Sequence, residues 1–196
     1  MLLALAPQDV SAHPHVFAKS RIEILHSGDG VFKGVRHSWT FDEMFSTFAT
    51  YGLAKKDGKI ASDQLTALAE RYVRSLKPYD YFTYAKQDGR PLRLDEPVDS
   101  VIEYDGTVLT LRFLLPSVSN AKMEKLEFEV YDSTYFVDLS PDEEKSATLG
   151  PPAEHCRVSS GKRSPGRYVD EGLLSSLSAK TNWAAEFAIT VSVDCQ

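Results

Sequence analysis

The chain has 196 residues, 42% of them hydrophobic and 26% charged, so it is long enough to bury one apolar core. Its net charge of −6 and isoelectric point near 5.4 argue against nucleic acid as the main partner, because phosphate binding needs a basic surface. The sequence also lacks a run of about 18 apolar residues, the length that a membrane-spanning helix needs.

Residues 1–12 are apolar and resemble the end of a secretory signal peptide rather than part of a folded domain. Val10 and Ala12 place small side chains at the −3 and −1 positions of a signal-peptidase site, which predicts cleavage after Ala12. We therefore expect a periplasmic protein of the Gram-negative type, with residues 13–196 forming a single domain. The alternative is a cytosolic protein with a ragged N-terminus, since the apolar run is short and no basic residue precedes it.

The folded part begins with two predicted strands, over residues 16–25 and 31–40, joined by a Ser-Gly-Asp-Gly turn. Period-two spacing predicts that one face of the second strand carries Val31, Lys33, Val35, His37 and Trp39.

The apolar period then becomes helical. Thr40 and Glu43 form a capping-box pattern, which predicts a helix from about residue 41 to residue 51. A second helix is predicted over 62–76. Together they predict a helical hairpin at about 41–77, inserted after the first strands.

The linker between these helices has the shape of an EF-hand calcium loop, with Asp57 and Gly58 at its fifth and sixth positions. Leu53, Lys55 and Gln64 then occupy positions where carboxylates are needed. We expect no calcium there.

The rest of the chain alternates like β-structure. The predicted strands cover 81–86, 100–104, 107–115, 125–131, 135–139, a stretch around Val158 and 187–195. The predicted loops cover 141–153 and 159–167, and a short helix is predicted over 169–177. The predicted class is α+β: a mostly antiparallel, β-rich, sandwich-like domain with an inserted helical hairpin.

Two cysteines, Cys156 and Cys195, lie in the last fifth of the chain. In an exported protein an even count predicts one disulfide, here between the last strand and the strand near Cys156. The alternative is a pair of unrelated buried thiols.

Several spaced segments together resemble one family. They are His-Pro-His-Val-Phe at 13–17, Trp-Thr-Phe-Asp-Glu at 39–43, Asp-Gly at 57–58, Tyr-Asp-Ser-Thr-Tyr-Phe at 131–136 and the terminal cysteine pair. They are similar to the domain of unknown function 1007 family, whose members are often labelled as the periplasmic component of an uncharacterised ABC-type transport system. The resemblance covers essentially all of the mature chain. Its association with nickel/cobalt exporter-type membrane proteins implies periplasmic handling of a transition metal.

Histidines near the predicted mature N-terminus could ligate a transition metal. His13 would offer an α-amine and an imidazole, His15 a second imidazole, and His37 a third if the first hairpin brings it close. Asp42 is a candidate for accepting a hydrogen bond from a ligand histidine and so orienting its ring. Zn, Ni, Co and Cu all suit such ligands. The alternatives are a terminus without a ligand role, a hydrogen-bonded core histidine at position 37 and a helix cap at position 42.

The sequence carries no nucleophile elbow, phosphate loop or His-Glu-x-x-His motif, and we expect no enzymatic activity. The leading expectation is a periplasmic accessory protein that binds or delivers a transition metal for a neighbouring membrane transporter. The alternative is a metal-free interaction module that docks onto a transporter through the helical hairpin. Exposure of Phe45, Phe48 and Tyr51 would favour docking, and convergence of the three histidines would favour metal.

Overall fold

The computed structural model describes residues 14–119, 122–142, 146–150, 153, 155–163 and 182–195. The predicted signal peptide, His13 and the predicted helix at 169–177 lie outside these residues. The described elements are β1 (Val16–His26), β2 (Phe32–Phe41), α1 (Glu43–Thr50), β3 (Lys55–Lys56), β4 (Lys59–Ile60), α2 (Ser62–Leu76), the 3₁₀ segment η1 (Lys77–Phe82), β5 (Thr83–Gln87), β6 (Arg90–Leu92), β7 (Val98–Tyr104), β8 (Leu109–Pro116), β9 (Lys125–Val130), β10 (Val137–Pro141), β11 (Ala147–Leu149), β12 (Cys156–Lys162), the 3₁₀ segment η2 (Trp183–Phe187) and β13 (Ile189–Cys195).

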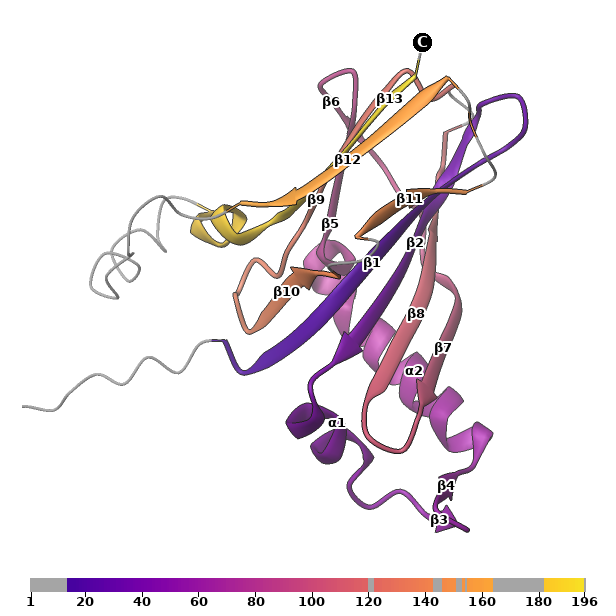
Figure 1. Cartoon of the computed structure of the whole chain (residues 1–196), viewed down its shortest axis with the longest axis vertical. Coiled ribbons are helices and arrows are strands. Elements are labelled where there is room, and N and C mark those ends of the chain that lie inside the picture. The colour runs from indigo at the N-terminus through magenta and orange to yellow at the C-terminus, as the bar shows by residue number, and fades with distance from the viewer. Residues whose placement is uncertain are drawn as a thin grey trace, which may run out of the picture.

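The strands form two main sheets, which confirms a mostly β protein with two helices (Figure 1). The first sheet has the order β10-β1-β2-β8-β7, with β11 also paired to β1, and the second has the order β12-β13-β9-β5-β6. Both β10 and β11 run parallel to β1, whereas the other pairs are antiparallel.

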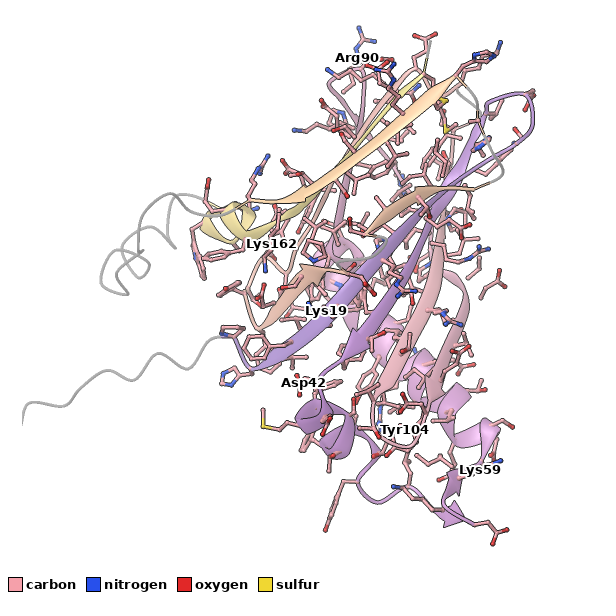
Figure 2. All side chains as sticks on the ribbon, in the orientation of Figure 1. Lys19, Asp42, Lys59, Arg90, Tyr104 and Lys162 are labelled. Carbon is pink, nitrogen blue, oxygen red and sulfur yellow. A yellow bond between two sulfur atoms is a disulfide. The ribbon has the colours of Figure 1, made fainter. Side chains whose placement is uncertain are left out.

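The two sheets share one apolar core. Alternate residues of β8 and β9 are buried, as period-two patterning predicts for strands with one face inward. Phe32 of the first sheet contacts Phe128 of the second, with ring centroids 5.9 Å apart. At the sheet edges, the Lys162 ammonium donates to Asp138 Oδ1 at 2.5 Å and so connects β12 to β10 (Figure 2).

A β-bulge changes which residues of β2 face the core. Leu25 pairs with Gly34, whereas His26 pairs with Phe32, so Lys33 is the extra residue. Val31 and Lys33 therefore do not share the buried face of His37, contrary to the sequence prediction. Gly34 is needed at this position because a Cβ there would lie 2.4 Å from the carbonyl oxygen of Leu115.

The two helices occupy the predicted stretch, but the structure does not show them packed as a hairpin. Helix α2 has the predicted bounds and packs on β7. Helix α1 lies at the end of β2, and Phe45 on its inner side contacts Tyr72 of α2 with ring centroids 5.8 Å apart. Figure 1 shows α1 as a separate short helix beside the lower end of the first sheet.

Several loops contain more regular structure than predicted. The loop predicted at 141–153 includes β11, which pairs with β1, and the loop predicted from residue 159 is part of β12 as far as Lys162. The EF-hand-shaped linker forms a small hairpin of β3 and β4, with Asp57 and Gly58 at positive φ as its two-residue turn. Within the described residues, no helix is long and apolar enough to cross a membrane.

Candidate functional site

The start of β1 carries His15 on its exposed side. His15 and Phe17 are exposed and alternate with the buried Val16 and Ala18, so His15 points away from the core. Its backbone N–H donates to the carbonyl of Phe136 at 2.9 Å, and its ring lies 4.9 Å from the Phe136 ring, centroid to centroid. His15 is therefore placed at the surface between β1 and the segment that leads into β10.

Asp42 lies between β2 and α1, beside this same end of β1 (Figure 2). Its Oδ1 accepts a hydrogen bond from the Phe45 N–H at 2.8 Å, and its Oδ2 accepts one from the Phe17 N–H at 3.0 Å. Asp42 is thus the N-cap of α1, where Thr40 had been predicted; Thr40 is a strand residue whose hydroxyl contacts that of Thr110. The carboxylate joins the start of β1 to α1.

His37 is not close to His15. The β1–β2 register places His37 opposite Ile22, seven residues along β1 from His15, which corresponds to roughly 23 Å of extended chain. His37 is fully buried and packs between Trp39 and Phe113. The expectation that the hairpin brings His37 near His15 is therefore wrong, because the strand register pairs His37 with Ile22 in the middle of β1.

The hydrogen bonds of His37 define its protonation state. The Thr83 hydroxyl donates to the Tyr81 carbonyl at 2.9 Å, so its lone pair faces His37 Nε2 at 3.0 Å and accepts the Nε2 proton. Nδ1 then carries a lone pair, and no partner for it exists among the described residues. Burial accordingly lowers the pKa of His37 to about 3, and the ring is neutral at physiological pH.

The described residues contain no group of three or more His, Cys, Asp or Glu side chains arranged to hold a metal ion. Cys156 and Cys195 form the predicted disulfide and pair directly across β12 and β13. His13 lies outside the described residues. Of the three predicted histidine ligands, the structure places His15 at the surface and His37 in the core.

Helix α1 has apolar residues on two faces. Phe45, which was expected to be exposed with Phe48 and Tyr51, instead packs inward with Ala49. Met44 and Phe48 lie on the outer side of the helix, and Tyr51 follows directly after it; their exposed fractions are 69%, 77% and 88%. We call these last three residues the α1 stripe. A helix of a globular protein normally presents polar residues to solvent, so the stripe is an unusual surface.

A cavity of about 580 Å³ lies behind α1, between β1, β2, the end of α2 and the segment that precedes β10. Its walls include the aromatic residues Trp39, Phe41, Phe45, Tyr72, Tyr79 and Phe82. Its lining also includes Asp132, which is buried and holds the following turn: its Oδ1 accepts from the backbone and hydroxyl of Thr134, and its Oδ2 from the Val137 N–H. The size and apolar character are typical of small-molecule sites.

This cavity could not be predicted from the sequence. Its wall residues come from segments as far apart as Val16 and Val137, so no local pattern indicates that they meet. The one available signal was the aromatic enrichment at the end of α2, where Tyr72, Tyr79 and Phe82 follow within eleven residues.

Comparison with known proteins shows which family this chain resembles. The family model described as a protein of unknown function (DUF1007) matches residues 1–195. Among curated proteins, the chain is 29% identical over 84 residues to an uncharacterised 15.5 kDa protein in the trpE 3′ region of Spirochaeta aurantia. That match covers 42% of this chain and 60% of the relative, so the chain spans less than two thirds of the relative's length.

Proposed function

Because the chain belongs to the DUF1007 family, which is described only as being of unknown function, we propose a role on physical grounds: the protein is a periplasmic interaction module that docks onto a membrane transporter through the α1 stripe. The exposure of Met44, Phe48 and Tyr51 carries this proposal. A transporter is the partner expected from the family resemblance, and the disulfide is consistent with an oxidising compartment such as the periplasm.

Helix α1 is held in a fixed position by hydrogen bonds to the rest of the fold, as a docking surface requires. Asp42 caps the helix, and the buried Ser46 accepts a hydrogen bond from the Leu109 N–H at 2.9 Å, which fixes α1 against β8. Phe17, about half exposed, extends the apolar surface at the helix start, because its N–H and carbonyl both bond to Asp42. The stripe is thus presented on a fixed element, which lowers the entropy cost of binding.

A photoreactive phenylalanine analogue at position 48 tests the docking proposal in cells that make the protein. We expect a light-dependent adduct with a membrane transporter, and none when the analogue replaces Thr66, an exposed residue of α2. Phe48→Ala should weaken binding to the captured transporter by roughly 30-fold or more, the effect of losing an aromatic anchor of about 2 kcal/mol. The unfolding free energy should change by less than about 0.5 kcal/mol, because Phe48 is largely exposed.

Two results contradict docking onto a transporter. Equal adducts at positions 48 and 66 would mean that the stripe is not selective. Adducts solely between copies of this chain would assign the stripe to self-association, which sedimentation measurements would then confirm.

Binding of a transition metal at the N-terminus is the second candidate function. Two observations favour it: His15 lies on the exposed side of β1, and the Asp42 carboxylate is held beside the same strand end, bonded to the Phe17 N–H. His13 and His15 would supply the nitrogen ligands, and Asp42 would support the site from behind, as carboxylates commonly do. His37 has no part in this site.

Calorimetric titration of the protein that begins at His13, with Zn²⁺, Ni²⁺, Co²⁺ and Cu²⁺, tests the metal proposal. We expect affinity of about micromolar or tighter that is lost in His13→Ala and in His15→Ala, because imidazole nitrogens are the proposed ligands. His26→Ala, at the opposite end of β1, is the control and should bind as the unaltered protein does. Absence of binding by the unaltered protein would overturn the metal proposal.

A further inference from the structure

We propose that the aromatic cavity behind α1 binds an apolar organic cation, whose positive group lies near the Asp132 carboxylate. This goes beyond docking through the α1 stripe, since Met44, Phe48 and Tyr51 are not among the cavity's lining residues. The two proposals therefore fail independently.

The walls of the cavity are built from packed aromatic rings. Trp39 stacks on Phe82 with ring centroids 5.7 Å apart, and Phe45 packs on Phe41 at 4.6 Å. Such rings present negatively polarised faces, which attract cations and also bury apolar groups favourably. A volume of about 580 Å³ falls within the usual range of roughly 300–1,000 Å³ for small-molecule sites.

The charge of the lining residues indicates which charge the ligand should carry. Asp132 is the single charged residue among the lining residues, and it is buried. Its hydrogen-bond donors are the neutral groups of Thr134 and Val137, and within the described part of the chain no basic side chain forms an ion pair with it. With no counter-ion among the described residues, this buried carboxylate favours a cation nearby and repels an anion.

The turn that leads into the cavity residue Phe82 adopts a backbone conformation that is costly for its residue types. Asp80, Tyr81 and Phe82 all have positive φ, between 51° and 56°. Residues other than glycine held in this region cost about 1–3 kcal/mol each, and such residues cluster at binding sites. The turn is held by the Tyr81 hydroxyl, which donates to Glu96 at 2.6 Å, and it brings Phe82 against the cavity.

Three ligands of the same shape test the proposal: 4-phenylbutylamine, 4-phenylbutanol and 4-phenylbutanoate. Titration would be followed by calorimetry and by the fluorescence of Trp39 in a Trp183→Phe background. We expect the amine to bind at least tenfold more tightly than the alcohol, and the carboxylate to bind most weakly. Equal binding of amine and alcohol, or no binding of any of the three, would overturn the proposal.

Two variants connect binding to this cavity. Ser75 is an exposed lining residue at the end of α2, so Ser75→Trp should block the cavity and abolish binding while the fold is kept. Thr66→Trp, on the same helix and away from the lining, should bind normally. Asp132→Asn should remove the preference for the amine over the alcohol. If Asp132→Asn fails to fold, the Ser75→Trp result decides, and unchanged binding in that variant overturns the proposal.

Discussion

Lowering the pH from 7.5 to 5 should destabilise the protein by about 2 kcal/mol through His37 alone. The unfolded chain binds a proton on this imidazole near pH 6.5, whereas the folded chain binds it near pH 3. Between these values unfolding takes up a proton, so the free energy of unfolding falls by up to about 1.4 kcal/mol for each pH unit lost. The full effect, complete near pH 3, is about 5 kcal/mol.

The physical reason is that a second proton on the His37 ring would find no hydrogen-bond acceptor among the described residues. Nε2 already bonds to Thr83, whose own proton bonds to the Tyr81 carbonyl. A proton on Nδ1 would place a charge in the core without an acceptor among the described residues. The stability contributed by the neutral ring is therefore fully present above pH 6.5 and is lost as the pH falls.

Urea unfolding at pH 7.5, 6.5, 5.5 and 5.0 measures this effect. His37→Gln keeps an N–H donor for Thr83 but cannot titrate, so its stability should be lower overall and nearly independent of pH across this range. His26→Gln, which replaces a part-exposed histidine, should keep the slope of the unaltered protein. Aspartate and glutamate side chains, whose ordinary pKa values lie near 4, are common to all three proteins and do not affect the comparison of slopes. An equal slope in His37→Gln and the unaltered protein would contradict the assignment.

Local sequence patterns correctly predicted the helix whose boundaries are set by residues close to it in the chain. Helix α2 was predicted over the observed residues, because its apolar spacing and the proline just beyond it define both face and end. The start of α1 was misplaced by two residues, because Thr40 and Asp42 are both good N-cap residues. Pairing of Thr40 with Thr110 in the sheet leaves Asp42 as the cap, and pairing across strands is not a local property.

The geometry of the candidate sites could not be predicted from the sequence, because it depends on contacts between residues far apart in the chain. The bulge at Lys33 and Gly34 changes the inward face of β2, and a strict period of two misses it. The distance between His15 and His37 depends on the length of the first hairpin and its register. The cavity requires β1, α2 and the Asp132 turn to meet in space. Of the expected docking residues, Phe48 and Tyr51 are exposed but Phe45 packs inward, since exposure depends on what the rest of the fold covers.

Reduction of the Cys156–Cys195 disulfide should lower the unfolding free energy by about 4 kcal/mol. The bond closes a chain segment with a sequence separation of 39 residues, and the loop-entropy model gives this size of effect for such a loop. The two cysteines face each other at one end of the β12–β13 pair, so the bond holds the two strands together at that end. On its other side β13 pairs with β9, so separation of β13 from β12 would also loosen the centre of the second sheet.

Guanidinium unfolding with and without a reducing agent measures the contribution of the disulfide. The double variant Cys156→Ala/Cys195→Ala is the control: it should match the reduced protein in stability and should not respond to the reducing agent. A loss below about 1 kcal/mol would mean that the hydrogen bonds of the β12–β13 pair already keep the strands together in the unfolded ensemble. A loss near 4 kcal/mol would make the folded state depend on an oxidising environment, which is the condition that the periplasmic proposal requires.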